Sequence, residues 1–303
     1  MTAPSPTLPG QTYMLTRRTA FRKFFLLPSE LVTQVFLYCL AASAPRFGLE
    51  VHAYCVLSNH YHLIVTDVRG NLPLFLHWFH VHVSKLLNLK YERAENLWSN
   101  EKTGKLALVS RVDVLDKIVY TIANPVSSGL VSRSERWPGP ISLADKLAGS
   151  IRQCLRPGFL FRRKGPCPRK ASLVLTKPPQ FADMSDEAFN VLVARRVAER
   201  EEALRAKRRG EGKGFLGRRQ LRRHSVEDTP STAARGAKSR LAINPRVASK
   251  NKWLRIQAIN SNRGFLEAHA AALEEWRSGN RDAVFPSGTW LMRVLHGVTC
   301  APP

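Results

Sequence analysis

Two β-forming segments that almost touch in sequence constrain this fold most. Leu49–Leu57 and Tyr61–Thr66 are rich in β-branched and aromatic residues. Ser58 and Asn59, which favour turns, lie between them. The spacing predicts either a hairpin or a bent pair of strands, and with it a mostly antiparallel sheet.

The segments around this pair alternate between strand and helix patterns. Further strands are predicted at Tyr13–Thr16 and Leu106–Val109. Helices are predicted at Ser29–Ala44, Pro73–Leu87 and Val112–Ala123, with Ser29 as an N-cap and Pro125 ending the third helix. The resulting order, strand–helix–strand–strand–helix–strand–helix, predicts an α+β fold.

The two halves of the chain differ in charge. Residues 1–150 contain 16 Lys and Arg against 10 Asp and Glu, whereas residues 151–303 contain 31 against 13. A net charge of +24 and a pI near 10.6 favour a polyanionic partner, nucleic acid before an acidic membrane surface.

A Pro/Gly cluster at residues 137–140 predicts a domain boundary. We expect a disordered N-terminus over residues 1–12, a globular domain over 13–140 and a basic, partly helical C-terminal extension over 141–303. The extension contains one clear helix pattern, Ser185–Lys207, and a segment around 208–240 whose composition predicts mobility. Two shorter helices are predicted at Lys250–Ile259 and Phe265–Ser278.

Composition argues against several classes of protein. Hydrophobic residues make up 44% of the chain, which is enough for a packed core. The longest apolar stretch, Leu31–Ala44, is shorter than the roughly 20 residues that cross a bilayer, and no secretory signal is evident. Five cysteines without a C-x-x-C pair favour a cytoplasmic protein over a disulfide framework or a Cys-based zinc site.

Two histidines flank a tyrosine at the start of the second β-forming segment. In a strand, His60 and His62 point to one face while Tyr61 points to the other. Two neutral imidazoles at this separation can share a divalent metal ion. The alternative is a half-exposed strand that carries two histidines without a metal.

The third predicted helix carries a second candidate motif. Tyr120 and Asn124 are four residues apart and therefore share a helical face. A tyrosine hydroxyl can attack a phosphodiester when a nearby metal stabilises the phosphate charge, and an amide oxygen suits Mg²⁺ or Mn²⁺. The alternative is a half-buried tyrosine and an asparagine that caps the helix end.

Together, the two motifs resemble a known family. Residues 57–65 read Leu-Ser-Asn-His-Tyr-His-Leu-Ile-Val, and residues 120–131 read Tyr-Thr-Ile-Ala-Asn-Pro-Val-Ser-Ser-Gly-Leu-Val. This combination looks like the single-tyrosine HUH transposases, in particular the branch of REP-associated tyrosine transposases. The resemblance runs from about Met14 to Gly139 and includes Trp98 and the Trp-Pro-Gly of residues 137–139.

The resemblance implies a fold and a set of roles. The fold is a ferredoxin-like antiparallel sheet with helices on one face. His60 and His62 would be metal ligands, Tyr120 the nucleophile and Asn124 a third ligand for Mg²⁺ or Mn²⁺. In such enzymes the tyrosine attacks single-stranded DNA, giving a 5′-phosphotyrosine and a free 3′-hydroxyl. The first strand of this chain departs from the family, because Tyr-Met-Leu-Thr-Arg-Arg lacks the histidine and the Arg-Gly of many relatives.

We therefore expect a metal-dependent DNA endonuclease and transposase that cuts and rejoins single-stranded or hairpin DNA, with flanking DNA held by the basic extension. One alternative is a catalytically inactive DNA-binding protein, such as a domesticated transposase acting as a repressor. An RNA-binding module ranks last, because the aromatic-rich strand pattern of an RRM is missing. Both a monomer and a homodimer stay open.

Overall fold

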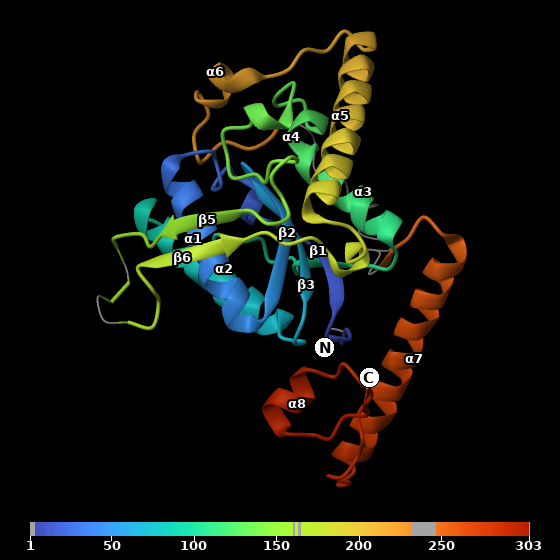
Figure 1. Ribbon diagram of the computed structural model, residues 1–303. Helices are drawn as coiled ribbons and strands as arrows, with labels where there is room; N and C mark the ends of the chain where they lie inside the picture. Colours follow the sequence, from blue (N-terminus) through green and yellow to red (C-terminus); the bar gives the residue numbers. More distant parts are fainter. Residues whose placement is uncertain (1–3, 160, 163–164, 232–246, 303) are drawn as a thin grey trace.

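A five-stranded sheet lies at the centre of the computed structural model, which describes residues 4–159, 161–162, 165–231 and 247–302 (Figure 1). The strand order is β2-β3-β1-β4-β7. The strands are β1 (Gln11–Arg18), β2 (Leu49–Leu57), β3 (His60–Asp67), β4 (Gly104–Leu108) and β7 (Val247–Ala248). The first four pair antiparallel and β7 joins β4 in parallel, so the predicted α+β fold with an antiparallel sheet is confirmed.

The two β-forming segments form a hairpin, one of the two predicted arrangements. Leu57 of β2 lies opposite His60 of β3, so Ser58 and Asn59 form the turn. The pleat of β3 sends Tyr61 to one face of the sheet and its two histidine neighbours to the other.

Two helices cover the face of the sheet to which Tyr61 points. These helices are α1 (Glu30–Phe47) and α2 (Leu72–Lys90). The Tyr61 ring is buried against Phe36 of α1 and Phe79 of α2, with ring centroids 5.4 and 5.9 Å apart. Such edge-to-face packing of large side chains anchors the helical layer expected on one face.

A third helix lies on the opposite face, where the histidines point. This helix, α3 (Arg111–Ile122), begins with a capping box between Ser110 and Asp113 and is followed by the short helix α4 (Asn124–Ser127). Ile118 and Ile122 are fully buried, which fixes the rotation of α3 about its axis. Asp113, Val114 and Thr121 of α3 are also buried, whereas Val112 and Tyr120 are exposed.

Segments that follow residue 139 pair with the free edge of β2. Backbone N–H groups of Val56 and Ser142 donate to the carbonyls of Pro140 and Tyr54, and the N–H of Thr176 donates to Val51. The outer edge of β2 is thereby covered along its length, which removes an exposed strand edge.

A hairpin and a long helix complete the core. The hairpin of β5 (Ile151–Leu155) and β6 (Lys170–Val174) packs on α1, and α5 (Asp186–Gly210) packs on α3. Buried residues of these elements and of the segments beside them belong to the main hydrophobic cluster, among them Leu147, Leu173, Phe181, Phe189 and Val193. The boundary predicted near residue 140 is therefore not a core boundary, because the Pro/Gly cluster lies along the edge of β2, hydrogen-bonded to Val56.

The last part of the chain forms a small separate cluster. It contains α7 (Lys252–Arg277) and α8 (Leu291–His296), with Ala272, Phe285 and Val298 buried between them, and projects away from the sheet (Figure 1). The two helices predicted at residues 250–259 and 265–278 are one helix. Gly264, at an exposed position, lowers helix propensity by only about 1 kcal/mol and does not interrupt it.

The bounds of β1, α5 and α6 (Gly217–Leu221) correct two further predictions. Gln11 and Thr12 belong to β1, so disorder does not extend through residue 12; Thr12 is buried and hydrogen-bonds Thr66. The segment predicted to be mobile, 208–240, contains the end of α5 and the helix α6, while its residues 232–240 lie outside the described residues.

The described residues also contain three 3-10 turns: η1 (Ala20–Arg22), η2 (Ser134–Arg136) and η3 (Pro179–Phe181). In the part of the chain that the structure describes, no helix combines the length and the apolar character needed to cross a membrane.

We predict that α5 contributes to stability as a core helix. Phe189→Ala should lower the free energy of unfolding by about 3–5 kcal/mol, because Phe189 is fully buried against Phe181. Val191→Ala on the same helix is the control, since Val191 is exposed and should change stability by less than about 0.5 kcal/mol. Urea denaturation measures both; equal effects would show that α5 does not share the core.

Candidate active site

The structure brings His60 and His62 together at the start of β3. Their ring centroids are 4.9 Å apart, with the rings nearly perpendicular. His62 lies opposite Thr16 of β1 in the sheet register, and its Nδ1 hydrogen-bonds the Thr16 hydroxyl at 2.8 Å. The pairing of β1 with β3 therefore engages Nδ1 of His62 in a hydrogen bond and leaves Nε2 without a hydrogen bond to β1.

Asn59 fixes the orientation of His60. The Asn59 amide nitrogen donates to the backbone carbonyl of Arg22 at 3.3 Å, which leaves its Oδ1 as an acceptor. That oxygen lies 2.7 Å from Nδ1 of His60, so Nδ1 carries the proton and donates. The lone pair of His60 is then on Nε2. Metal-binding histidines generally donate their second ring nitrogen in this way.

The second nitrogen of His62 has no partner of its own. Nε2 of His62 is buried and makes no hydrogen bond in the described part of the chain. A buried polar atom without a partner costs free energy, and native structures rarely leave one without a role. A metal ion would give this nitrogen the partner that it lacks.

Burial and nearby cations keep both imidazoles neutral. Burial lowers the pKa of His60 to about 4, with smaller contributions from Arg18 and Arg22. Burial also holds the pKa of His62 well below its usual value, and His60, Arg18 and Lys117 add to the effect. Neutral imidazoles keep the lone pairs that a metal requires.

Tyr120 lies beside this pair. Its ring centroid is 5.3 Å from that of His62, although the two residues come from α3 and β3. The side chain is 38% exposed, so its hydroxyl is accessible to a large substrate. Nζ of Lys117, one turn earlier on α3, lies 5.7 Å from the centre of the Tyr120 ring. Three of the four predicted site residues are thus linked through contacts in the structure.

Asn124 is not linked to the histidines by a hydrogen bond among the described residues. It is buried at the start of α4, and its Oδ1 accepts a hydrogen bond from the Ser128 hydroxyl at 3.3 Å. The helix-end cap that was the alternative role is held by Ala123, the C-cap of α3. The role of Asn124 as a third ligand stays a prediction.

The donor set suits a metal ion that is only partly enclosed by protein. Within the described ranges, no group of three or more His, Cys, Asp or Glu side chains is arranged to hold a metal. The two imidazoles therefore need further ligands of another kind, such as an amide oxygen, water or a phosphate oxygen. Sites with open positions are typical of catalytic rather than structural metals.

Several residues around the site were missed by sequence reasoning. Thr16 and Asn59 hold the two imidazoles, and Arg18, Arg22 and Lys117 supply positive charge beside them. Asn59 had been assigned only to a turn. The position of Thr16 follows from strand register, which a single sequence does not specify.

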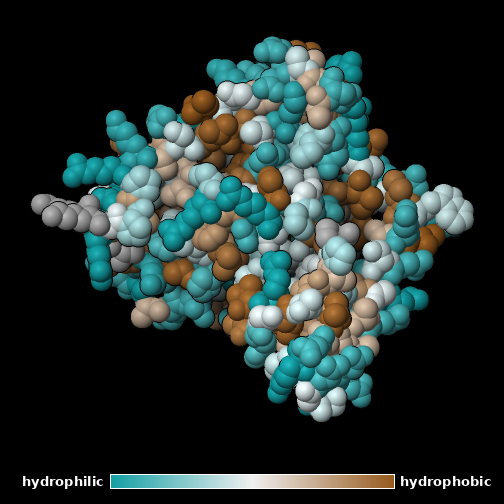
Figure 2. All heavy atoms as spheres, turned by 60° about the horizontal axis from the view of Figure 1, so that its bottom comes forward, coloured by the Kyte–Doolittle hydropathy of each residue, from teal (hydrophilic) through white to brown (hydrophobic). Residues whose placement is uncertain are grey.

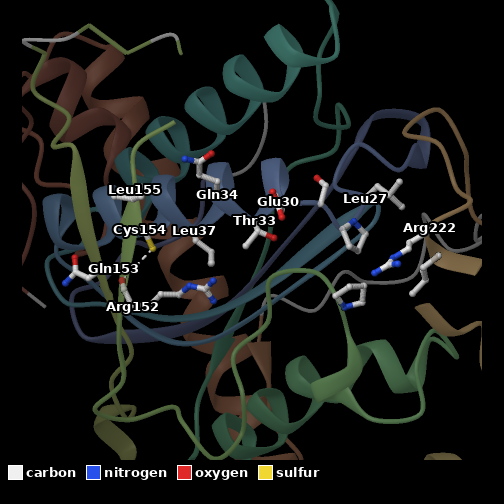
Figure 3. A pocket seen from close by; sticks show the side chains of 14 residues that line it. Leu27, Glu30, Thr33, Gln34, Leu37, Arg152, Gln153, Cys154, Leu155 and Arg222 are labelled. Atoms are coloured by element: carbon white, nitrogen blue, oxygen red, sulfur yellow. Dashed lines mark hydrogen bonds between the residues drawn. The ribbon is translucent and has the colours of Figure 1, made fainter. Parts of the chain in front are cut away.

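A cavity of about 800 Å³ lies apart from this cluster (Figure 3). It is bounded by the first turns of α1, by β5 and by the chain near α6, and Arg152 and Arg222 lie toward opposite ends of it. None of its lining residues belongs to the His–Tyr cluster. This cavity is therefore not part of the candidate site.

No family model and no curated protein matches the chain. Among solved structures, it is similar to a REP-associated tyrosine transposase bound to a REP hairpin, with 19% identity and a TM-score of 0.38 over 46% of this chain and 81% of that one. It is also similar to a candidate transposase from Deinococcus radiodurans, with 20% identity and a TM-score of 0.28 over 35% of this chain and 85% of that one. At these TM-scores neither structure assigns a function to this chain.

We predict that the chain binds Mn²⁺ through its histidine pair. His62→Ala should abolish binding in isothermal titration calorimetry, and Thr16→Ala should weaken it about 10- to 100-fold, because Thr16 orients the His62 ring. His77→Ala is the control, since His77 is exposed on α2, the helix on the other face of the sheet. Wild-type affinity in His62→Ala would remove this site from consideration.

Proposed function

We propose that this chain is a metal-dependent HUH single-tyrosine DNA endonuclease and transposase that cuts and rejoins single-stranded or hairpin DNA. The observation that carries the proposal is that the His62 ring contacts both the Tyr120 ring and the His60 ring. A partly exposed tyrosine beside two neutral imidazoles combines a nucleophile with metal ligands. The sequence motifs predicted these residue types in these roles.

Tyr120 performs the covalent chemistry in this proposal. Its hydroxyl oxygen forms a bond to the scissile phosphorus while the bond from phosphorus to the 3′-oxygen breaks. The phenolic proton is lost to solvent, and the departing 3′-oxygen takes up a proton to become a hydroxyl. Another 3′-hydroxyl later attacks the 5′-phosphotyrosine, which restores a phosphodiester and the free tyrosine without an external energy source.

His60 and His62 would hold the metal, with Asn124 as the proposed third ligand. Thr16 and Asn59 set the two ring orientations, so that both lone pairs are available. When bound, Mn²⁺ or Mg²⁺ supplies Lewis-acid stabilisation of charge on the phosphoryl oxygens. Imidazole donors favour a transition ion such as Mn²⁺ over Mg²⁺, which prefers an all-oxygen shell.

Positive charge around the site favours a phosphate substrate. Arg18 and Arg22 act on His60, and Arg18 and Lys117 act on His62, in each case lowering the pKa of the imidazole. The same cations attract a phosphodiester to the Tyr120 hydroxyl. The charge of the whole chain, +24, extends this attraction to the flanking DNA.

We predict that Tyr120→Phe abolishes cleavage and keeps DNA binding. Phenylalanine retains the ring that packs on His62 and removes only the attacking oxygen. With Mn²⁺ and end-labelled single-stranded DNA, the wild-type protein should acquire the label 3′ of the cut in a form that survives boiling in detergent. Tyr91→Phe is the control; it removes a hydroxyl that bonds the Phe25 carbonyl, away from the site.

Three outcomes would contradict this proposal. An adduct that persists in Tyr120→Phe would identify another nucleophile. Cleavage by the wild-type protein without any adduct would indicate attack by water. Binding without cleavage in the wild-type protein would favour the alternative, an inactive DNA-binding protein.

We predict that cations around α6 contribute to binding through phosphate contacts. Replacing Arg219, Arg222 and Arg223, all exposed, by alanine should flatten the dependence of log affinity on log salt by about 2, since each contact to single-stranded DNA contributes about −0.7. Arg195 and Arg196 are the control, because both pair with Glu199. Fluorescence anisotropy at several salt concentrations measures the slopes, and equal slopes would refute an electrostatic role for α6.

A further inference from the structure

An exposed aromatic side chain stands in the loop that follows β1. Phe21 is 86% exposed, the highest value among the large hydrophobic side chains of the described residues. Burying a phenylalanine stabilises a fold, and this one contributes almost nothing to the core. Its neighbours Phe25 and Leu26 are fully buried, so the loop itself is well anchored.

The backbone at Phe21 is strained. Phe21 has φ 51° and ψ 18°, and Arg22 has φ 61°, a left-handed conformation that bulky residues rarely adopt. Hydrogen bonds hold it: the N–H of Thr19 donates to the carbonyl of Asn59, and that of Ala20 donates to Leu97. Strain of this kind is retained where surrounding structure imposes it, often at functional sites.

The loop is joined directly to the candidate active site. The carbonyl of Arg22 accepts a hydrogen bond from the Asn59 amide, whose oxygen accepts one from His60. Arg18, also exposed, lies opposite His60 in the register of β1 and β3. Phe21 thus lies between Arg18 and Arg22 in the sequence, and Asn59 connects the backbone of its loop to His60.

An exposed aromatic ring with arginines before and after it in the sequence suits one ligand chemistry. A nucleic acid strand alternates flat bases with phosphates, so a single aromatic ring can stack on a base while arginines contact the adjacent phosphates. A base paired in a duplex presents no free face, so the ligand must be unpaired. An isolated ring between charges is too small for an apolar protein interface, whose core excludes charge.

We infer that Phe21 is a stacking platform for an unpaired base of the bound strand, with Arg18 and Arg22 contacting the phosphates on either side. The inference rests on the proposed function, because it places this base next to the phosphate that Tyr120 attacks. Phe21 is then a positioning residue for the strand. The strained loop keeps the ring in solvent, ready to stack, instead of allowing it to fold onto the core.

Binding measured without catalysis tests this inference. The protein carries Tyr120→Phe throughout, and the probes are a labelled oligothymidylate of about 12 nucleotides, an abasic strand of equal length and a duplex. Phe21→Ala should weaken binding of the oligothymidylate about 5- to 100-fold and leave duplex binding unchanged. Phe21→Trp should retain or increase affinity, since indole also stacks.

The abasic strand tests whether Phe21 acts through a base. If Phe21 acts through a base, the abasic strand should bind the parent protein more weakly than oligothymidylate does, and Phe21→Ala should weaken it no further. Phe21→Gly separates a binding role from a structural one, because glycine adopts the left-handed backbone freely. The melting temperature of the Phe21→Gly variant should equal or exceed that of the parent protein, while its affinity for oligothymidylate falls.

Three results would overturn the inference: unchanged oligothymidylate affinity in Phe21→Ala, equal losses for single strand and duplex, or a lower melting temperature in Phe21→Gly. Failure of the proposed function is distinguishable from these. Absence of cleavage by the protein with Tyr120 intact would reject the enzyme while leaving a Phe21-dependent preference for unpaired bases.

Discussion

The pleat of β3 is the constraint on which the rest of the structure depends. Tyr61 is fully buried among Phe36, Phe79 and Trp98, so a shift of β3 by one residue would place histidines in that core. Because the register is fixed by this packing, His60 and His62 must emerge together on the other face. The hydrophobic core thereby positions the polar site.

The site and its surroundings combine neutral donors with positive charge. The imidazoles are neutral because they are buried, and the cations beside them belong to β1, to the loop after it and to α3. Among the described residues, no carboxylate joins the two histidines in a metal-binding group. Protein side chains in the described ranges therefore supply no negative charge there to balance these cations. A phosphodiester and a divalent ion would complement each other there, each offsetting the charge that the other brings.

The face of the molecule that Figure 2 shows mixes hydrophilic and hydrophobic side chains. In Figure 2 hydrophilic side chains cover much of one face, and hydrophobic groups interrupt them in small clusters. Isolated apolar side chains on a charged surface are ordinary in soluble proteins. Phe21 stands out from these by its strained backbone and by its link to His60 through Asn59.

Sequence patterns predicted the fold wherever the determinants are local. The β2–β3 hairpin follows from strand propensity and a short turn, and the N-cap at Ser29 from a hydroxyl that accepts from the N–H of Val32. The proximity of Tyr120 to the histidines followed from the family resemblance alone. The attachment of residues 141–210 could not be predicted, because it depends on pairing with the distant edge of β2. The Arg22–Asn59–His60 connection likewise depends on tertiary contacts and a left-handed backbone at a non-glycine residue.

Mass spectrometry of the covalent intermediate tests the central claim most directly. The protein is incubated with Mn²⁺ and single-stranded DNA, the DNA is trimmed with nuclease, and the chain is digested with trypsin. Residues 118–133, between Lys117 and Arg133, form one peptide that contains Tyr120 and no other tyrosine. The account predicts a nucleotide linked through phosphate to Tyr120 in this peptide. A nucleotide on any other peptide, with residues 118–133 unmodified, would contradict it.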